Sequence, residues 1–360
     1  MTAPAAIADV LAGRARWAVE CGDCLALLRG LPDTCVDLIA TDPPFFKLKD
    51  DDWDHAWPDE SAYLAWLGTV RDEWRRVLRP NGGLYCFASS RMAARVEIVI
   101  AERFDVLNSI VWEKPRSAHN RSDPQSLRSF FPATERIIFA EVHGADGSAL
   151  RGSGYAAADA KAHAGVFEPL RAYLDGERIR AGITARQVDE FCGTNGMAGH
   201  WFGASQWELP TAAAYAKLRE LFNSGTDGGF LRREYEDLRR PFVLAGDPVW
   251  ASTDVWHFTT VPFSEGKHPC EKPADLCDHL IHTSTRPDAL VLDCFAGSGA
   301  ILAAAVRAGR RAIGCDADPA WTERVRALLA ATETGRVVRP FRGASADPGQ
   351  LRLFGAEEAR

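Results

Sequence analysis

Alternation of short apolar runs with helical segments constrains the fold of this chain more than any other feature. Apolar, β-branched runs such as residues 36–40 and 289–293 indicate buried strands, and stretches with helical spacing separate one strand from the next. Strands that alternate with helices of about ten or more residues form mainly parallel sheets covered on both faces. The sequence therefore predicts an α/β chain with a mostly parallel, doubly wound sheet.

The expected elements follow from the same patterns. We expect strands at residues 17–21, 36–40, 84–88, 106–113, 136–141, 289–293 and 311–315, and helices at 24–29, 61–78, 91–103, 300–306 and from about 319. Ser61 is the expected N-cap of the helix at 61–78, and the turn at 79–83 is its expected end.

The alternating pattern is interrupted between residues 144 and 250, where helices and glycine-rich joints replace it. Thr184 and Gln187 have the spacing of a capping box, and the short helix that they begin is expected to end at Gly193. A second short helix at 197–202 and a third opened by Thr211 follow. Two short helices joined by a glycine-containing turn fit a helix-turn-helix, and they fit a small packed helical subdomain equally well.

The stretch Asp42-Pro43-Pro44-Phe45-Phe46 lies where the strand at 36–40 ends. Two consecutive prolines stop the strand and restrict the backbone on either side, so a carboxylate and two aromatic rings are held close together. Such a corner suits a planar, polar ligand, although an ordinary strand exit is the alternative.

A second loop has the spacing of a cofactor site. Asp293, Phe295, Gly297 and Gly299 lie at a strand-to-helix turn, and the next strand ends at Asp316, from which a carboxylate can accept hydrogen bonds from ribose. A dinucleotide fingerprint requires a third glycine where Leu302 stands, and the leading carboxylate repels pyrophosphate. Both features favour S-adenosylmethionine, whose cationic groups attract carboxylates, over a nicotinamide cofactor; a tight structural turn is the remaining alternative.

Taken together, these two loops resemble the signature motifs of the amino-group DNA methyltransferases, and their order resembles the β-type arrangement of that family. Further matches are Gly22-Asp23, the segment 78–83, and His268-Pro269 with Glu271-Lys272-Pro273. The resemblance covers about 17–141 and 250–330. Departures are Ala300, where the family often has Thr, and Asp316, where Glu is common.

The resemblance implies a Rossmann-like, S-adenosylmethionine-dependent methyltransferase fold. It implies four parts: a catalytic part at 1–143, a helical target-recognition insertion at 144–250, a cofactor-binding part at 251–335 and a flexible tail at 336–360. It implies catalytic roles for Asp42, Pro43, Pro44 and Phe45, with Asp42 and the Pro43 carbonyl accepting hydrogen bonds from the target amino group and Phe45 stacking on a flipped base. It implies a cofactor site at Asp23, Lys272, Pro273, Asp293, Phe295, Ala296, Gly297, Ser298, Gly299 and Asp316.

The family also implies site-specific methylation of double-stranded DNA, as in restriction-modification. Asp rather than Ser at residue 42 is associated with the N6 amino group of adenine, and N4 of cytosine is the alternative. A helix-turn-helix regulator without catalysis is the alternative from another class, and it would not need Asp42.

Composition narrows the remaining possibilities. A net charge of −7 argues against non-specific coating of nucleic acid, and the basic groups that could favour DNA are clustered. The two clusters are Lys114, Arg116, Arg121, Arg128 and Arg136, and Arg232, Arg233, Arg239 and Arg240. The nine scattered cysteines are expected to be reduced, and Cys21 and Cys24 have no second pair at zinc spacing, so no metal is expected. No long apolar run or signal segment is present, and we expect a soluble cytoplasmic protein.

The tail contains a candidate partner site. Gln350-Leu351-Arg352-Leu353-Phe354 resembles the short peptide by which bacterial DNA-processing proteins dock on the replication sliding clamp, and packing of the tail on its own domain is the alternative. The oligomeric state stays open from the sequence, with a homodimer among the options.

Overall fold

The computed structural model describes residues 4–48, 52–114, 130, 132–142, 168–203, 207–225, 229–238, 253–262 and 267–335. The chain divides into two compact units, one built from residues 1–140 and 241–360 and the other from 141–240. The expected tail at 336–360, the candidate clamp peptide Gln350–Phe354, and Arg116, Arg121, Arg128, Arg239 and Arg240 lie outside the described residues.

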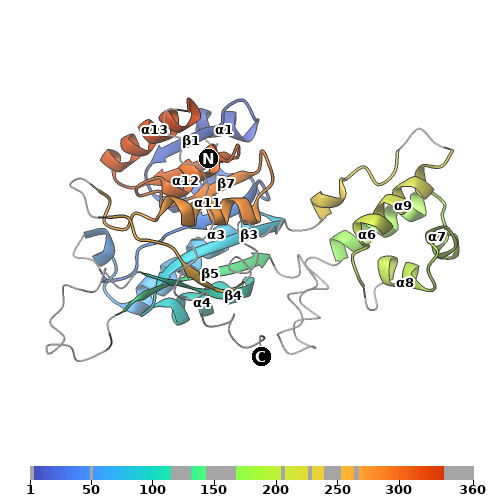
Figure 1. The fold of residues 1–360 in the computed structure, drawn as a ribbon, viewed down its shortest axis with the longest axis horizontal. Helices are drawn as coiled ribbons and strands as arrows, with labels where there is room; N and C mark the ends of the chain where they lie inside the picture. Colours follow the sequence, from blue (N-terminus) through green and yellow to red (C-terminus); the bar gives the residue numbers. More distant parts are fainter. Residues whose placement is uncertain are drawn as a thin grey trace, which may run out of the picture. The chain divides into compact units, whose positions relative to one another are not determined.

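The first unit is organised around an eight-stranded sheet (Figure 1). Its strands are β1 (Trp17–Cys21), β2 (Val36–Thr41), β3 (Leu78–Ser89), β4 (Phe104–Glu113), β5 (Thr134–Val142), β6 (Val255–His257), β7 (Leu290–Asp293) and β8 (Arg311–Asp316). The spatial order is β1-β8-β7-β2-β3-β5-β4-β6. The pairs β1–β8, β8–β7, β7–β2, β2–β3 and β4–β6 are parallel, which confirms the mostly parallel sheet expected from the sequence.

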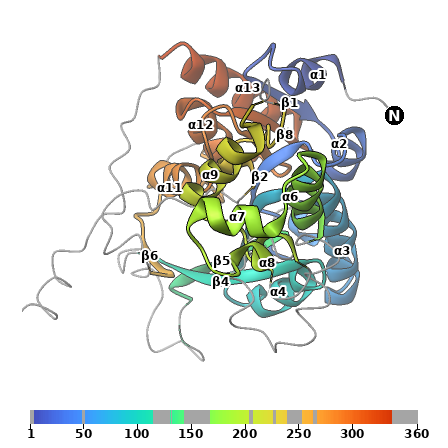
Figure 2. The same ribbon diagram turned by 90° about the vertical axis from the view of Figure 1, so that its right-hand side faces the viewer.

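Helices cover both faces of this sheet, as Figure 2 shows. One layer consists of α11 (Ala274–Ser284), α12 (Ala300–Arg307) and α13 (Pro319–Glu333), and the other of α2 (Cys24–Gly30), α3 (Glu60–Val77) and α4 (Ala93–Ala101). The short helix α1 (Ala5–Leu11) contacts β1 and β8, and a 3-10 turn covers Asp52–His55. The fold is thus the doubly wound, Rossmann-like arrangement that the sequence predicted.

Several boundaries differ by one or two residues from the expectation, and for two elements, α3 and β3, the difference has a clear physical reason. Helix α3 begins at Glu60, and its N-cap is Asp59, whose carboxylate accepts the Ala62 N–H at 2.8 Å, so the prediction of Ser61 was wrong. Asp and Ser cap helices about equally well, and sequence alone does not rank two adjacent candidates.

Strand β3 begins at Leu78, earlier than predicted, and runs through Pro80. The pairing of β2 with β3 shifts register between Val36 and Leu38, and this irregularity accommodates the proline that was expected to end the helix and open a turn.

Helix α12 packs unusually close to β8. A Cβ at Gly314 would lie 2.4 Å from Leu302 Cδ1, so glycine on the strand makes room for leucine on the helix. In dinucleotide-binding loops the glycine that permits this approach sits on the helix. In this protein the glycine of the helix–strand contact is Gly314 on the strand, and the larger residue, Leu302, is on the helix.

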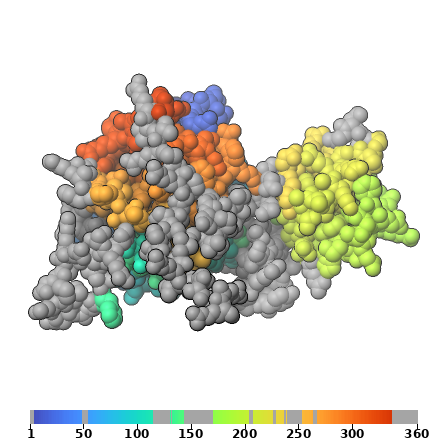
Figure 3. Space-filling view, in the orientation of Figure 1, coloured from blue at the N-terminus to red at the C-terminus, as the bar shows by residue number. Residues whose placement is uncertain are grey.

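The second unit is helical, and Figure 3 shows its described helices as one closely packed body. It contains α6 (Glu168–Arg180), α7 (Ala185–Cys192), α8 (Met197–Phe202), α9 (Ala212–Asn223) and a 3-10 turn at Tyr235–Leu238. The capping box of α7 is confirmed, with reciprocal bonds of 3.3 and 2.9 Å between Thr184 and Gln187, and Gly193 ends the helix at φ +72°. Helices α1 and α6 and the three-residue strand β6 were not predicted.

Buried apolar side chains from α6, α7, α8 and α9 meet in a core of their own, which includes Leu174, Val188, Trp201 and Leu218. Within the residues that the structure describes, no helix combines the length and apolar character needed to cross a membrane.

Candidate active site

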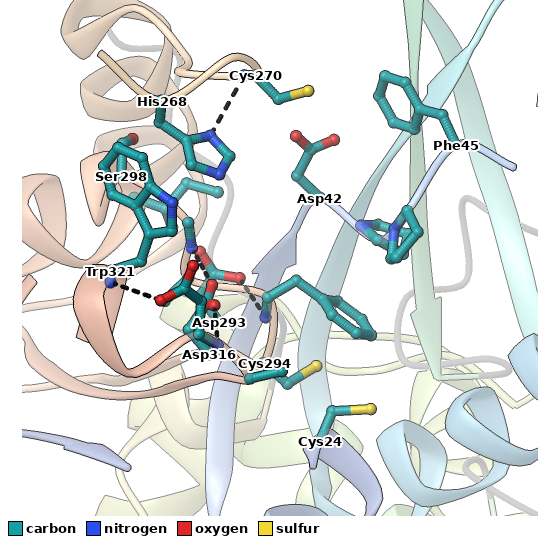
Figure 4. A pocket seen from close by; sticks show the side chains of 18 of the residues that line it. Cys24, Asp42, Phe45, His268, Cys270, Asp293, Cys294, Ser298, Asp316 and Trp321 are labelled. Atoms are coloured by element: carbon teal, nitrogen blue, oxygen red, sulfur yellow. Dashed lines mark hydrogen bonds between the residues drawn. The ribbon is translucent and has the colours of Figure 1, made fainter. Parts of the chain in front are cut away.

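The ends of four neighbouring parallel strands build one cavity of about 610 Å³ in the first unit. Segments that follow β1, β2, β7 and β8 meet there because the carboxyl ends of parallel strands share one edge of the sheet. The lining residues are Gly22, Asp23, Cys24, Asp42, Pro43, Pro44, Phe45, Ala56, Trp57, Trp66, His268, Pro269, Cys270, Lys272, Asp293, Cys294, Phe295, Ala296, Gly297, Ser298, Ala300, Ile301, Asp316, Ala317, Asp318 and Trp321. The two loops singled out in the sequence therefore face the same space (Figure 4).

The loop after β2 is held from both of its ends. The buried Tyr63 donates its hydroxyl hydrogen to the Pro44 carbonyl at 2.8 Å. Beyond the prolines, Phe46 and Lys47 have φ of 60° and 56°, a left-handed conformation that non-glycine residues seldom adopt. The Lys47 N–H compensates by donating to the Asp54 carbonyl at 2.9 Å, so surrounding contacts maintain the strained turn.

Asp42 lies at the start of this loop with its two carboxylate oxygens in different environments. Oδ2 accepts a hydrogen bond from Lys272 Nζ at 2.5 Å, whereas Oδ1 is buried and has no hydrogen-bond partner. Burial raises the pKa of the Asp42 carboxyl to about 6, against the lowering effect of Lys272. Near neutral pH the side chain is therefore an ionised acceptor with one uncommitted oxygen.

Charged groups continue behind Asp42. Lys272 Nζ also lies 3.4 Å from Glu135 Oε2, and Glu135 in turn accepts a hydrogen bond from Lys114. Burial disfavours the Lys272 ammonium, yet the Asp42 and Glu135 carboxylates outweigh it and raise its pKa. Two carboxylates and two ammonium groups thus alternate, and no pattern in the sequence indicated that Glu135 belongs to the site.

The other half of the cavity is formed by the loop after β7. Asp293 Oδ1 accepts the Thr41 hydroxyl at 2.8 Å and the Phe295 N–H at 3.1 Å. Burial raises the pKa of the Asp293 carboxyl to about 7. Asp316 Oδ2 accepts the Gly297 N–H at 2.7 Å, and burial raises the pKa of this carboxyl too. These bonds tie the ends of β2, β7 and β8 together.

Aromatic and imidazole side chains that the sequence reasoning missed complete the walls. Trp66 lies 5.8 Å from Phe295 and 4.5 Å from Trp57, measured between ring centroids. His268 packs edge-on against Trp321 at 4.7 Å, and both side chains line the cavity (Figure 4). One signal was available: Trp66 lies beside the buried stripe of α3 and not within it.

Nearly all residues predicted from the sequence line the cavity, and two do not. Pro273 is the N-cap of α11, and Gly299, at φ +78°, is the N-cap of α12. A Cβ at Gly299 would lie 2.9 Å from Val325 Cγ1, so this glycine serves close packing. Asp23 lines the cavity and also caps α2 through the Ala26 N–H at 3.0 Å.

The donor set fits S-adenosylmethionine. The half of the cavity beside β7 and β8 contributes the carboxylates of Asp293, Asp316 and Asp318, and Lys272 is engaged by Asp42. Such an acidic wall repels phosphates, attracts sulfonium and ammonium groups, and can accept hydrogen bonds from ribose hydroxyls. The cavity volume lies within the range of about 300 to 1,000 Å³ that is typical of small-molecule and cofactor sites.

The amino-acid sequence is similar to those of known DNA methyltransferases. The sequence profile of the N6/N4 DNA methylase family matches residues 36–325. The type II methyltransferase M2.MboI of Moraxella bovis is 23% identical over 321 residues, which cover 84% of this chain and 83% of that protein.

Two solved structures are also similar. The cytosine-N4-specific PvuII DNA methyltransferase superposes with a TM-score of 0.50 at 14% identity, covering 89% of this chain and 94% of that one. A putative DNA modification methylase of Thermus thermophilus, complexed with S-adenosyl-L-methionine, gives a TM-score of 0.47 at 18% identity, covering 89% and 97%. The PvuII enzyme has the same overall fold.

Proposed function

Because the chain belongs to the N6/N4 DNA methylase family, we propose that it transfers a methyl group to the N6 amino group of an adenine extruded from a specific double-stranded DNA site. The observation that carries this proposal is the buried, unpartnered Oδ1 of Asp42, which lies on a rigid Pro-Pro loop at the edge of the cofactor cavity. An acceptor in that position is available to an exocyclic amino group.

S-adenosylmethionine is the methyl donor, and when bound it supplies an electrophilic methyl group. We assign its binding to the loop Asp293–Ser298, with Asp316 and Asp23 toward the ribose and amino-acid parts. Phe295, whose ring lies 5.8 Å from that of Trp66, forms an apolar wall of this part of the cavity.

The residues after β2 prepare the nucleophile. An exocyclic adenine nitrogen is a weak nucleophile because its lone pair is delocalised into the ring. Asp42 Oδ1 and the Pro43 carbonyl accept its two hydrogens, which favours a tetrahedral nitrogen with a localised lone pair. The nitrogen–methyl bond would form as the sulfonium–methyl bond breaks and the thioether leaves, and the proton that the nitrogen loses would pass to Asp42 or to water.

Positioning contributes more than proton transfer. Alignment of two bound reactants lowers a barrier by about 7 to 11 kcal/mol, whereas general base catalysis contributes a factor of about 10² to 10⁴. Extrusion of the base costs a few kcal/mol, and stacking on Phe45 offsets about 1 to 3 kcal/mol of it. Phe45 is buried against the core, so its ring is already in place before DNA binds.

Cytosine N4 is the second candidate target. The PvuII enzyme is cytosine-specific by its name. Asp at position 42, where cytosine-specific members tend to carry Ser, favours adenine.

We assign target recognition to the helical unit at 141–240. In it, Asp189 accepts hydrogen bonds from the Thr194 hydroxyl and from the Gly196 and Ala198 N–H groups, and so fixes the turn between α7 and α8. A fixed turn between two short helices is what a helix-turn-helix requires to present its second helix. A catalytically inactive regulator is disfavoured because it would have no use for the cavity around Asp42.

Labelled methyl transfer tests the activity, and single-molecule sequencing of DNA from cells that express the protein tests the base. We expect N6-methyladenine at one short sequence with the wild type and none with Asp42→Ala. Asp288→Ala, which removes a surface carboxylate paired with Arg16, is the control and retains activity. Methylcytosine in place of methyladenine would decide for the second candidate.

Four further expectations stay predictions. A role in restriction-modification is supported by the type II relative. Docking of Gln350–Phe354 on a sliding clamp is tested by titrating the tail peptide and its Leu353→Ala, Phe354→Ala variant against the clamp. A homodimer is tested by sedimentation, and a cytoplasmic location by fractionation.

A further inference from the structure

We infer that Lys272 is a positioning residue for Asp42: it takes up one carboxylate oxygen and so dedicates the other, in its ionised form, to the target amino group. Glu135 holds Lys272 from the other side. This inference rests on the proposed function and changes the role that the sequence suggested for Lys272, which was cofactor binding.

The contacts of the ammonium group support this assignment. A lysine ammonium has three hydrogens. In the structure Lys272 Nζ donates to Asp42 Oδ2 at 2.5 Å and to the Cys270 carbonyl at 3.4 Å, and it forms an ion pair with Glu135 Oε2 at 3.4 Å. The side chain of Lys272 is 5% exposed, and its Nζ lies 4.9 and 5.3 Å from the ring centroids of Phe87 and Phe45. The ammonium group is thus enclosed between two carboxylates and a carbonyl, on the side of the cavity where Asp42 lies.

A cofactor carboxylate would have to displace one of these acceptors to reach Lys272. The adjacent Pro273 is the N-cap of α11 and does not line the cavity. The contact with Asp42 is therefore the main role of this lysine.

The alternation of charges explains why a second carboxylate is present. Asp42 and Glu135 compete for the same ammonium group, and Lys114 pairs with Glu135. Each opposite charge favours ionisation of Asp42 and each like charge opposes it. Lys272 and Lys114 therefore favour the ionised, acceptor form of Asp42, whereas Glu135 opposes its ionisation.

Substitutions of Lys272 and of Glu135 should therefore shift the pH profile of kcat in opposite directions. We expect Lys272→Met to move the acid limb of the kcat profile to higher pH, because Asp42 then protonates more readily. We expect Glu135→Gln to move the same limb to lower pH, because one like charge is removed. Three other titratable groups of the described residues interact electrostatically with Asp42, namely Asp293, Tyr63 and Cys86. All three are retained in both variants.

The loss of kcat, compared with the Kd for S-adenosylmethionine, distinguishes a positioning role of Lys272 from a role in cofactor binding. Lys272→Met should lower kcat at neutral pH by about 100-fold, the scale of a misplaced reacting group. Lys272→Arg should recover part of this loss because it restores the charge. The Kd for S-adenosylmethionine, measured by calorimetry without DNA, should change by less than about threefold in all three variants, a shift of about 0.6 kcal/mol.

The matched control is Lys267→Met, because Lys267 Nζ donates to the Val261 carbonyl and has no carboxylate partner among the described contacts. It should leave the acid limb in place. If Lys272→Met is too slow to profile, Glu135→Gln and Lys272→Arg carry the test. The inference is overturned if Glu135→Gln leaves the limb unmoved or raises it, or if Lys272→Met abolishes cofactor binding. Failure of the proposed function has a different signature, namely no methyl transfer by the wild type.

Discussion

The hydroxyl of Tyr63 on α3 donates to the Pro44 carbonyl at 2.8 Å, so one main-chain oxygen of the loop after β2 is engaged within the protein. The Pro43 carbonyl is the one that we propose as the second acceptor for the target amino group. The stacking of Phe46 on Tyr63, with centroids 5.5 Å apart, holds the same loop from its far end. A residue outside the motif thus determines the geometry within it.

Tyr63→Phe should therefore lower kcat by about 10- to 100-fold with little change in cofactor affinity, because the loop is loosened by the loss of one hydrogen bond. Single-turnover methylation measures the effect. Tyr85→Phe is the matched control, since Tyr85 is equally buried and bonds Ser284 away from the cavity. Equal losses in the two variants would show that Tyr63 contributes stability alone.

Gly297→Ala should weaken S-adenosylmethionine binding by at least about tenfold, or about 1.4 kcal/mol. Gly297 has φ +49°, and a Cβ there would lie 3.0 Å from His268 Cε1, so the substitution displaces the ring that lines the cavity. Calorimetric titration measures the affinity.

Gly309→Ala serves as its control. Gly309 has φ +75° with nothing within 4 Å of the added Cβ, so this variant carries only the left-handed strain of roughly 1 to 2 kcal/mol. It should lower the melting temperature and leave the Kd for the cofactor unchanged. A similar loss of affinity in both variants would contradict the role of His268.

Asp293 should make the apo protein less stable as pH rises. Its folded-state pKa, about 7, lies above the ordinary value of 3.8 because of burial. The folded chain then holds the proton more tightly than the unfolded chain, so the contribution to stability is fully present below pH 3.8 and is lost as pH rises through about 7.

Denaturant unfolding between pH 5 and pH 8 should show this loss as a few kcal/mol, at about 1.4 kcal/mol per pKa unit. Asp293→Asn should flatten the dependence, and Asp33→Asn, which alters a surface carboxylate, should not. A wild-type stability that rises over the same interval would refute the assignment of a raised pKa to Asp293.

Phe45→Leu should reduce capture of the extruded base. The substitution retains an apolar side chain but removes the ring, whose stacking on a base is worth about 1 to 3 kcal/mol. With 2-aminopurine at the mapped target position, we expect a smaller fluorescence change on DNA binding and a KM for DNA raised about tenfold.

Phe139→Leu is the corresponding control, because Phe139 stacks on Tyr85 at 4.4 Å within the core and does not line the cavity. It should lower stability without altering the fluorescence response. An unchanged response in Phe45→Leu would assign base stacking to another ring.

Local patterns in the sequence were sufficient for most of the framework. Strand runs ending at Thr41, Asp293 and Asp316 could be located because buried parallel strands are short, apolar and followed by turn residues. The capping box at Thr184 was equally visible because its bonds join residues three apart. Elements without such local signals, such as α6 and β6, were missed.

The amino-acid sequence by itself determined the sheet, the position of the two loops at its edge and, through the resemblance that they carry, the family. It did not determine which charges meet there. Asp42 and Lys272 are 230 residues apart, and their contact, like that of Lys272 with Glu135, depends on strand order and on the side chains buried around them. Because pairing of buried charges is a property of three-dimensional neighbours, only the tertiary structure decided that Lys272 pairs with the Asp42 carboxylate.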